Sequence, residues 1–475
     1  MRPKLHPLES DHVRDQLALR SVVANEVRTQ PEGEYILYWM QSTHRFEDNW
    51  ALRAAVLAAD RLGKPLLVHQ GLDPTYEHAN DRIHTVILEN ARALHARAER
   101  LGFRYQFVLR RRRDDDRRVV DRLASRAAQV ITDLFPTAGI AERTQRFAER
   151  APCRVITVES HGIIPSGHFV KEEYAARTIR PKIAKVLDLA MEPCEDRAPS
   201  REFSDALWHS LEVDRVDLAR MDVAAEVAKC EIDHSVPSVP FASGIDGARA
   251  RLKAFCKGAL ADYAERRNEP SDTDGSSRLS PYLHFGQISA AEVLRTVRAA
   301  GHAESARKFE DELVTWRELA FNFCLRNPNY GKLRGLPDWV HRTMDAHKDD
   351  PREAVYSLAQ LERAETHDEL WNAAQRELVR TGYMHNVTRM LWGKSVLTWT
   401  KRYKHALDHL ILLNNKYGLD GRDPSSFGGI QWCFGKFDRP WFDKPVWGVI
   451  RPMSLARARE KFDADAYIAM NRARR

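Results

Sequence analysis

Short apolar runs alternate with helical segments through the first half of the chain, and this rhythm restricts the fold more than any other feature. Five such runs, rich in β-branched and aromatic residues, occupy positions 34–40, 64–71, 104–110, 128–134 and 153–160. Segments of helical periodicity separate them. Strands and helices in this order form a parallel sheet with helices on both faces. We therefore expect a Rossmann-like α/β domain.

No standard nucleotide-binding motif accompanies these strands, because neither GxGxxG nor GxxxxGK[ST] occurs in this half. Ligands of such sheets bind at the carboxyl ends of the strands. Residues 39–41 and 70–71 stand there, and they are equally compatible with ordinary loops.

The second half has a different texture. After residue 247 the β-rich runs disappear and helical patterns follow one another. Stretches rich in Pro, Ser and charge lie between about residues 190 and 240. A chain of 475 residues favours two domains. We expect an α/β domain at 1–190, a linker at 191–240 and an all-α domain at 241–475.

Composition restricts the partners and the location. The net charge of +7 permits a polyanionic partner, but the densest basic cluster, at 110–118, is interrupted by three Asp residues and fits a solvated loop better. The six cysteines form no CxxC pair, so structural zinc and disulfides are not expected. No apolar run approaches the ~20 residues of a membrane span, and the N-terminus lacks a secretory signal. We expect a cytoplasmic protein.

The stretch 381–399, TGYMHNVTRMLWGKSVLTW, carries an unusual set of side chains. A helix is expected from about His385. Trp392 and Trp399 lie seven residues apart, which places both indoles on one helix face. Trp371 belongs to the helix expected before it. Such a row of indoles can be core packing or a path for electrons.

Two other helical segments carry side chains suited to a ligand. In residues 276–289, SSRLSPYLHFGQIS, serine hydroxyls precede a helix and can cradle a phosphate, or can simply cap the helix. In residues 312–319, ELVTWREL, Glu312 and Trp316 share a helix face. They can bind a polar heterocycle, or can belong to an ordinary amphipathic helix.

A loop at residues 414–426, NNKYGLDGRDPSS, adds two carboxylates. Asp420 and Asp423 can pair with Arg389 or bind hydroxyl groups of a ligand. They can also serve only the turn.

A second loop, GIQWCFGKFDRPW at 429–441, combines Trp432 and Trp441 with Lys436 and Arg439. A stacking surface beside positive charge suits an unstacked base and its phosphates. Buried tryptophans that anchor a loop give the same pattern.

Taken in order, these motifs resemble the photolyase/cryptochrome family, most closely the class II cyclobutane pyrimidine dimer photolyases. The resemblance covers nearly the whole chain and rests on YWMQSTHRFEDNWAL (38–52), AARTIRPKI (175–183), SRLSPYLHFGQIS, ELVTWREL, TGYMHNVTRMLWGK, LLNNKYGLDGRDP and WCFGKFDRPW. Two positions depart from the family pattern. His44 stands where the family has Asp or Gln, and the residues around Arg389 and Met390 are less aromatic.

The resemblance implies an FAD held in the helical domain. Its phosphate and ribityl parts would contact Tyr263, Ser276, Ser277, Leu279 and Ser280. Arg389 and Asp420 would pair beside the isoalloxazine ring. Asn414 would face the flavin N5 atom, and Asp423 would contact the ring edge or the ribityl chain. The N-terminal domain would be the antenna domain, with a deazaflavin or a folate as the candidate second chromophore.

The resemblance also implies roles at the lesion. Glu312 would hydrogen-bond the bases of the dimer, and Met390 would contact them. Trp316 and Trp432 would stack around the flipped dimer, while Arg267 would hold the gap left in the duplex. The electron route to the surface would run through Trp392, Trp371 and Trp399.

The implied activity is that of a carbon–carbon lyase acting as a monomer on double-stranded DNA. An electron from photoexcited FADH⁻ would open the cyclobutane ring and then return. A cryptochrome-like photoreceptor and a (6-4) photoproduct photolyase are the alternatives. The long tail of many cryptochromes does not follow Trp441, and His284 has no second histidine beside the LSPYLHFG motif. Both observations favour the dimer-splitting enzyme.

Overall fold

The computed structural model describes residues 11–194 and 196–472, and the chain divides into two compact units. Unit 1 comprises Met1–Val170, Val186–Ala250 and Tyr282–Arg295, and unit 2 comprises Lys171–Lys185, Arg251–Pro281 and Thr296–Arg475. This division differs from the expected boundaries. The segment expected to be a linker buries Phe203, Leu211 and Val223 in the cores of unit 1. Residues 1–10 and residue 195 of the expected domain and linker lie outside the described residues.

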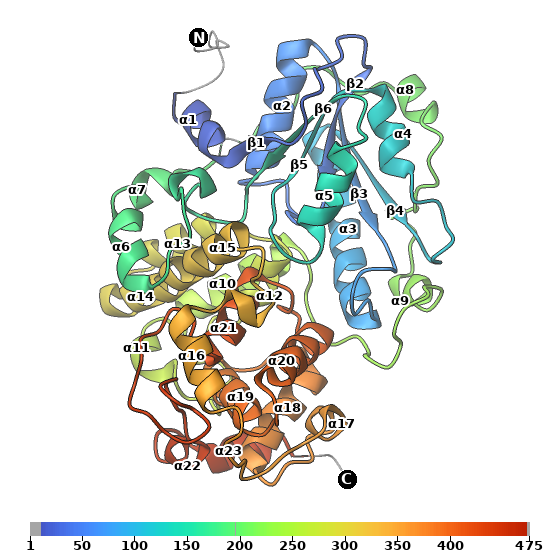
Figure 1. The fold of residues 1–475 in the computed structure, drawn as a ribbon. Helices are drawn as coiled ribbons and strands as arrows, with labels where there is room; N and C mark the ends of the chain where they lie inside the picture. The colour runs from blue at the N-terminus through green and yellow to red at the C-terminus, as the bar shows by residue number, and fades with distance from the viewer. Residues whose placement is uncertain (1–10, 195, 473–475) are drawn as a thin grey trace. The chain divides into compact units, whose positions relative to one another are not determined.

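Unit 1 is built on a six-stranded sheet in the order β1-β6-β5-β2-β3-β4 (Figure 1). The strands are β1 (Ser21–Val23), β2 (Tyr35–Met40), β3 (Leu66–Leu72), β4 (Arg104–Leu109), β5 (Ala127–Asp133) and β6 (Arg154–Val158). β2 to β6 run parallel, and β1 pairs antiparallel with β6. The expected Rossmann-like sheet is confirmed, and each apolar run forms a strand. The short, largely exposed β1 gives no periodic signal in the sequence.

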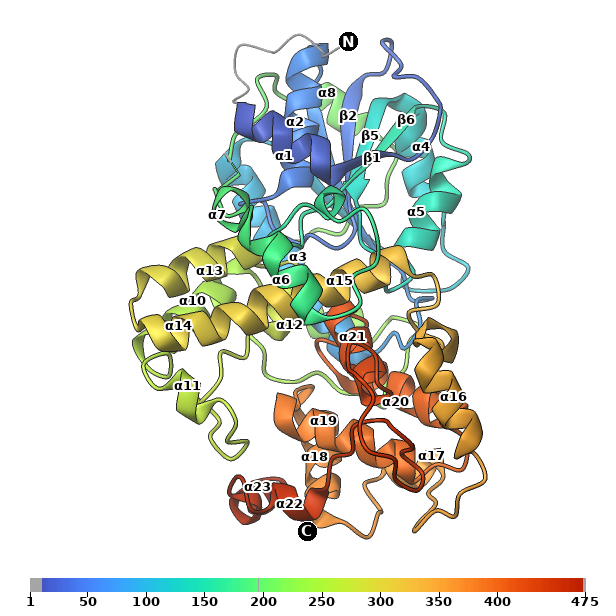
Figure 2. The same cartoon turned by 60° about the vertical axis from the view of Figure 1, so that its left-hand side comes forward.

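Helices cover both faces of this sheet. They are α1 (Asp11–Arg20), α2 (Trp50–Leu62), α3 (Asp81–Leu101), α4 (Val119–Arg126), α5 (Ile140–Ala148), α8 (Asp205–His209) and α9 (Val223–Val227). Unit 1 also contains the short helix α7 (Leu187–Ala190) and a 3-10 turn, η1, at Ser166–His168. Side chains of β2 alternate between the faces. Tyr38 packs in the core with α2 and α3, whereas Leu37 packs with α4 and α5. Figure 2 shows these two helix pairs on opposite sides of the sheet.

Unit 2 is helical, as expected. Its elements are α6 (Ala176–Ala184), α11 (Tyr263–Arg266), α14 (Ala303–Glu310), the π-helical turn η2 (Asp311–Trp316), α15 (Arg317–Arg326), the 3-10 turn η3 (Leu333–Gly335), α16 (Asp338–Ala346), α17 (Leu358–Glu362), α18 (Glu369–Thr381), α19 (Asn386–Thr398), α20 (Tyr403–Tyr417), α21 (Pro424–Cys433), α22 (Leu455–Ala458) and α23 (Ala464–Met470). The boundary between the units falls within α10 (Ile245–Lys257), α12 (Ser280–His284) and α13 (Ala290–Ala299). No helix among the described residues has both the length and the apolarity needed to cross a membrane.

Candidate functional site

Helix α19 is the element on which the candidate site is built, and it packs beside α18 (Figure 1). α18 ends at Gly382, whose φ of 71° favours glycine. The ring of His385 then caps α19 by accepting a hydrogen bond from the Val387 N–H at 3.2 Å. Burial lowers the pKa of His385 to about 4. The ring is therefore neutral, and its Nδ1 atom can accept this bond.

The ion pair between Arg389 and Asp420 links α19 to the loop between α20 and α21. Arg389 Nη2 donates to Asp420 Oδ1 at 3.0 Å, and the two side chains are only 16% and 11% exposed. Burial lowers the pKa of Arg389, but the Asp420 carboxylate outweighs that effect and raises it overall. The predicted pairing of these two residues is therefore present.

Asn414 and Asp423 flank this loop. Asn414, in the last turn of α20, is buried and donates from Nδ2 to Asn415 Oδ1 at 3.1 Å. Asp423 caps α21, since its carboxylate accepts a hydrogen bond from the Ser425 N–H at 2.8 Å. The Asp423 carboxylate thus has a structural partner at the start of a helix.

The loop that carries Ser276 and Ser277 is held against α10 and the turn before α19. Arg251 donates from Nε to the Ser277 carbonyl and from Nη2 to the Ser276 carbonyl, both at 2.8 Å. The Ser276 hydroxyl lies 3.2 Å from the Tyr383 hydroxyl. This arrangement fixes the loop through its carbonyls and connects it to α19.

Arg278 is a residue of this loop that the sequence patterns do not single out. Its φ of 52° lies in the left-handed region, and its guanidinium lies 4.7 Å from the centre of the Tyr383 ring. Its Nε atom is buried without a hydrogen-bond partner among the described residues. Leu279 beside it is buried, whereas Ser280 is exposed at the first turn of α12.

Glu312 forms an ion pair with Arg267 at 2.7 Å. Glu312 and the half-buried Trp316 belong to η2, and π-helical turns of this kind are frequent at functional sites. The Arg267 guanidinium lies 5.7 Å from the ring of Tyr263, which packs against Phe309. Burial raises the pKa of Tyr263 to about 12. The backbone of Arg267 acts to raise the pKa of His385 and so lies beside the ring that caps α19.

The three indoles of the expected electron route form one contiguous stack. Trp371 lies between the other two, with ring centres 6.3 Å from Trp392 and 5.7 Å from Trp399. Trp371 Nε1 donates to the Trp392 carbonyl at 3.0 Å, and Trp392 Nε1 donates to Gln375 Oε1 at 2.9 Å. All three indoles are at least 95% buried. Their contact distances suit stepwise electron transfer as well as core packing.

Two residues beyond Trp399 extend this stack outward. The rings of Tyr356 and His367 lie 5.6 and 5.0 Å from Trp399, and His367 is exposed. The Tyr356 hydroxyl lies 2.6 Å from His367 Nδ1. Neither residue has a motif that could identify it in the sequence.

The three expected DNA contacts in the loop after α21, Lys436, Arg439 and Trp441, differ in exposure. Lys436 is buried, and its ammonium contacts Glu172 at 2.5 Å and the Gly335 carbonyl at 2.8 Å. It is therefore already satisfied inside unit 2. Arg439 is exposed, and Trp441 is 38% exposed. Only these two of the three remain at the surface.

Met390 and Trp432 are joined through α21. Met390 Cε lies 3.5 Å from where a Cβ atom would stand on Gly429. Trp432, one turn further along α21, is half-buried. α19 thus contacts the Asp420 loop and α21, and the turn before it, Tyr383 to His385, contacts the Ser276 loop and Arg267. Together these segments contain most of the predicted site residues.

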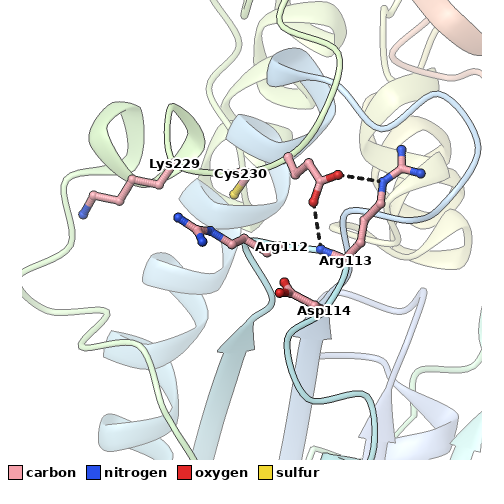
Figure 3. Close-up of a pocket in the computed structure, with 6 residues that line it drawn as sticks. Arg112, Arg113, Asp114, Lys229 and Cys230 are labelled. Carbon is pink, nitrogen blue, oxygen red and sulfur yellow. Dashed lines mark hydrogen bonds and ion pairs between the residues drawn. The ribbon is translucent and has the colours of Figure 1, made fainter.

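A shallow pocket of about 520 Å³ lies elsewhere, in unit 1 (Figure 3). Arg112, Arg113 and Asp114 line one side, and Lys229 and Cys230 line the other. The carboxylate of Glu231 accepts hydrogen bonds from the backbone and the guanidinium of Arg113. Three cations and two carboxylates line this pocket, which leaves one net positive charge.

Comparison with known proteins agrees with this geometry. The family model "DNA photolyase" matches residues 36–200. Solved structures with the same fold include a photolyase from Sulfolobus tokodaii with two FAD molecules, with a TM-score of 0.65, 18% identity and coverage of 91% of this chain and 88% of that one. A Synechocystis cryptochrome gives a TM-score of 0.68, 16% identity and coverage of 92% and 88%.

Two relatives are similar over most of their length. A deoxyribodipyrimidine photo-lyase from Methanothermobacter thermautotrophicus is 36% identical, covering 92% of this chain and 94% of the relative. Another from Arabidopsis thaliana is 36% identical, covering 91% and 88%. At this identity over nearly the full length of both sequences, the chain belongs to the DNA photolyase family.

Proposed function

We propose that this protein is a light-driven lyase of class II that splits cyclobutane pyrimidine dimers in double-stranded DNA. The observation that carries the proposal is that the segments with the predicted flavin and lesion residues meet at α19 and the turn before it. Arg389 in the first half of α19 pairs with Asp420, the turn just before the helix contacts the Ser276 loop through Tyr383, and Trp392 in the middle of the helix begins a stack of three indoles. The class II motifs at 175–183 and 414–441 support the class. The monomeric state and the cytoplasmic location remain predictions.

The residues present fit an FAD. The buried Nε of Arg278 lacks a hydrogen-bond partner among the described residues, as a donor reserved for a ligand would. The buried Arg389–Asp420 pair offers a fixed charge beside a polar ring system. Ser276 and Ser277 are held by their carbonyls, so their hydroxyls can turn to phosphate oxygens. Tyr263, Leu279 and Ser280 would complete this wall, and Asp423 would act mainly by capping α21.

When bound in its reduced form, FAD supplies the photoexcited electron that opens the cyclobutane ring. Asn414 would present its amide to the flavin ring from inside α20. A deazaflavin or a folate in unit 1 remains a prediction for the antenna chromophore.

The lesion must leave the duplex, which costs a few kcal/mol and less for a poorly paired base. Trp316 and Trp432 are both half-buried, so each presents part of its indole for stacking. Glu312 would hydrogen-bond the dimer, and Met390 would contact it. Arg267 is already paired with Glu312, so it is held ready to enter the gap in the duplex.

Contacts with phosphate would come from exposed cations, because such contacts provide affinity that does not depend on sequence. Arg439 and the neighbouring Trp441 fit this role. We leave Lys436 out of the DNA contacts because its ammonium is buried on Glu172. It would instead hold the loop in place.

Two matched oligonucleotides test the proposed substrate. One contains a cyclobutane thymine dimer and the other a (6-4) photoproduct at the same position. Under blue light, the purified protein should restore the first and leave the second unchanged. Restoration of the (6-4) lesion would assign the chain to the other repair class, and restoration of neither would favour a photoreceptor.

A further inference from the structure

Lys394 is a fully buried lysine in α19, and none of the roles described above uses it. Its exposed fraction is 0%. Its Nζ donates to the Arg451 carbonyl at 2.8 Å. It also lies 4.7 Å from the centre of the Trp432 ring and 5.7 Å from that of Trp447. The ammonium thus stands between α21 and the loop that follows it.

The surroundings of Lys394 do not neutralise its charge by an ion pair. No carboxylate among the described residues lies within 4.0 Å of its Nζ, whose hydrogen bond goes to a backbone carbonyl. The ionisable groups that act on it are the buried thiol of Cys433, the carboxylate of Asp438 and the guanidinium of Arg451. Burial lowers the pKa of Lys394 to about 8. A buried ammonium without a carboxylate partner is unfavourable, so the aromatic faces must compensate for part of its lost hydration.

We propose that Lys394 is a positioning residue for lesion binding, whose ammonium fixes the indole of Trp432 in the orientation that stacks on the flipped dimer. This inference rests on the proposed function, in which Trp432 contacts the lesion. The half-buried Trp432 has two cations beside its ring, the buried Lys394 ammonium at 4.7 Å and the guanidinium of the exposed Arg451 at 5.9 Å, and the buried one lies closer. The same ammonium ties down the backbone of Arg451, whose guanidinium lies 4.9 Å from the Trp441 ring. Lys394 therefore acts on Trp432 directly and on Trp441 only through the backbone of Arg451.

The physical effect is on orientation. A desolvated cation over an indole restricts the ring and lowers the entropy it loses on stacking. An apolar side chain of similar length keeps the packing and removes the charge, and such replacements of buried charges are often tolerated. Lys394→Met should therefore fold, with the preference for dimer-containing over undamaged DNA reduced roughly three- to tenfold. Cleavage within the saturated complex should change little, because Lys394 does not contact the dimer.

The experiment compares affinities for one oligonucleotide with and without a thymine dimer, measured in the dark by fluorescence anisotropy. Wild type, Lys394→Met and Lys404→Met are assayed in parallel. Lys404 is the control because its side chain is 72% exposed and paired with Asp408. The preference should fall in Lys394→Met and stay at the wild-type value in Lys404→Met. An unchanged preference in Lys394→Met overturns the proposal.

A pH series on wild type gives a second test that needs no variant. As the pH rises from about 7 to about 9.5, the ammonium loses its proton, and the preference should fall by a similar factor. The profile of Lys394→Met should be flat. A flat wild-type profile contradicts the proposal even if the variant does not fold. If wild type shows no preference at any pH, the proposed function itself fails.

Discussion

Glu312 is the residue whose observed ion pair bears most directly on its proposed role at the lesion. Its carboxylate is paired with Arg267 at 2.7 Å and is partly exposed on η2. A carboxylate in this state can exchange one partner for another without first being desolvated. Binding of a dimer would thus free Arg267 for the duplex while Glu312 turns to the bases.

Substituting Glu312 tests this exchange. Glu312→Ala should lower the yield of light-driven repair by roughly tenfold, because a hydrogen bond to a charged group contributes about 1.5–3 kcal/mol. Affinity for dimer DNA should fall less, since stacking and phosphate contacts remain. The yield per absorbed photon and the dissociation constant are measured on the same preparation. The control is Glu310→Ala. Glu310 ends the adjoining helix α14 and pairs with Arg298, and this variant should match wild type in both yield and affinity. Equal losses in yield and affinity would remove the specific role of Glu312.

Trp371 tests the electron route, because it is the middle ring of the stack. Trp371→Phe retains an aromatic ring but removes the readily oxidised indole. Photoreduction of oxidised flavin should drop to a small fraction of the wild-type rate, while chemically reduced protein should still repair dimers. The absorbance of the flavin under illumination reports the first, and dimer counts report the second. Trp339→Phe, outside the stack, should leave both unchanged. Undiminished photoreduction in Trp371→Phe would exclude this route.

At the scale of elements, the approach of α15 to α21 sets the position of Trp432. A Cβ atom on Gly428 would stand 2.7 Å from the Ala320 Cβ, closer than real Cβ contacts allow. Glycine at this position of α21 therefore permits the two helices to touch. The next residue, Gly429, has more space, because its nearest neighbour would be the flexible end of Met390 at 3.5 Å.

The two glycines provide a matched pair of variants. Gly428→Ala should lower the free energy of unfolding, because overpacking costs about 1–3 kcal/mol and exceeds the ~1 kcal/mol that alanine gains in a helix. Gly429→Ala should be neutral or stabilising, because only the helix preference changes. Urea unfolding of both variants measures the difference. Equal free energies of unfolding for the two variants would show that α15 can move away from α21 at little cost.

At the scale of the whole molecule, four buried histidines connect stability to pH. Burial lowers the pKa of His44, His84 and His385 to about 4 and that of His69 to about 3. Three of them lie in unit 1 and His385 in unit 2. All four rings are neutral in the folded chain at neutral pH.

The sign of the pH dependence follows from these pKa values. An unfolded histidine binds its proton near pH 6.5, so between about pH 6.5 and 4 the unfolded state holds more protons. The free energy of unfolding should therefore decrease as pH falls through that window, by at least about 2 kcal/mol. Urea midpoints from pH 7 to pH 4.5 measure it. His69→Gln should flatten the dependence, and His209→Gln, at an exposed site, should not. A midpoint that rises on acidification would contradict the account.

Much of this architecture could be predicted from the sequence, and the exceptions have physical causes. The five parallel strands could be predicted because strands buried on both faces are continuously apolar in sequence. The composition of residues 191–240 is typical of a linker, but Phe203 and Leu211 are buried there because they pack into a core beside the sheet. Opposite charges made Arg389 and Asp420 a predictable pair. Lys436 was not predictable, because its partner Glu172 lies 264 positions away in the chain.

The central claim is that this chain splits cyclobutane dimers only when light excites a bound, reduced flavin. The most direct measurement is the fraction of dimer remaining in an oligonucleotide incubated anaerobically with the reduced protein, in blue light and in darkness. The dimers should disappear in the light, with recovery of intact thymines, and persist in darkness. Loss of dimers in darkness, or full retention of dimers in the light, would contradict the claim.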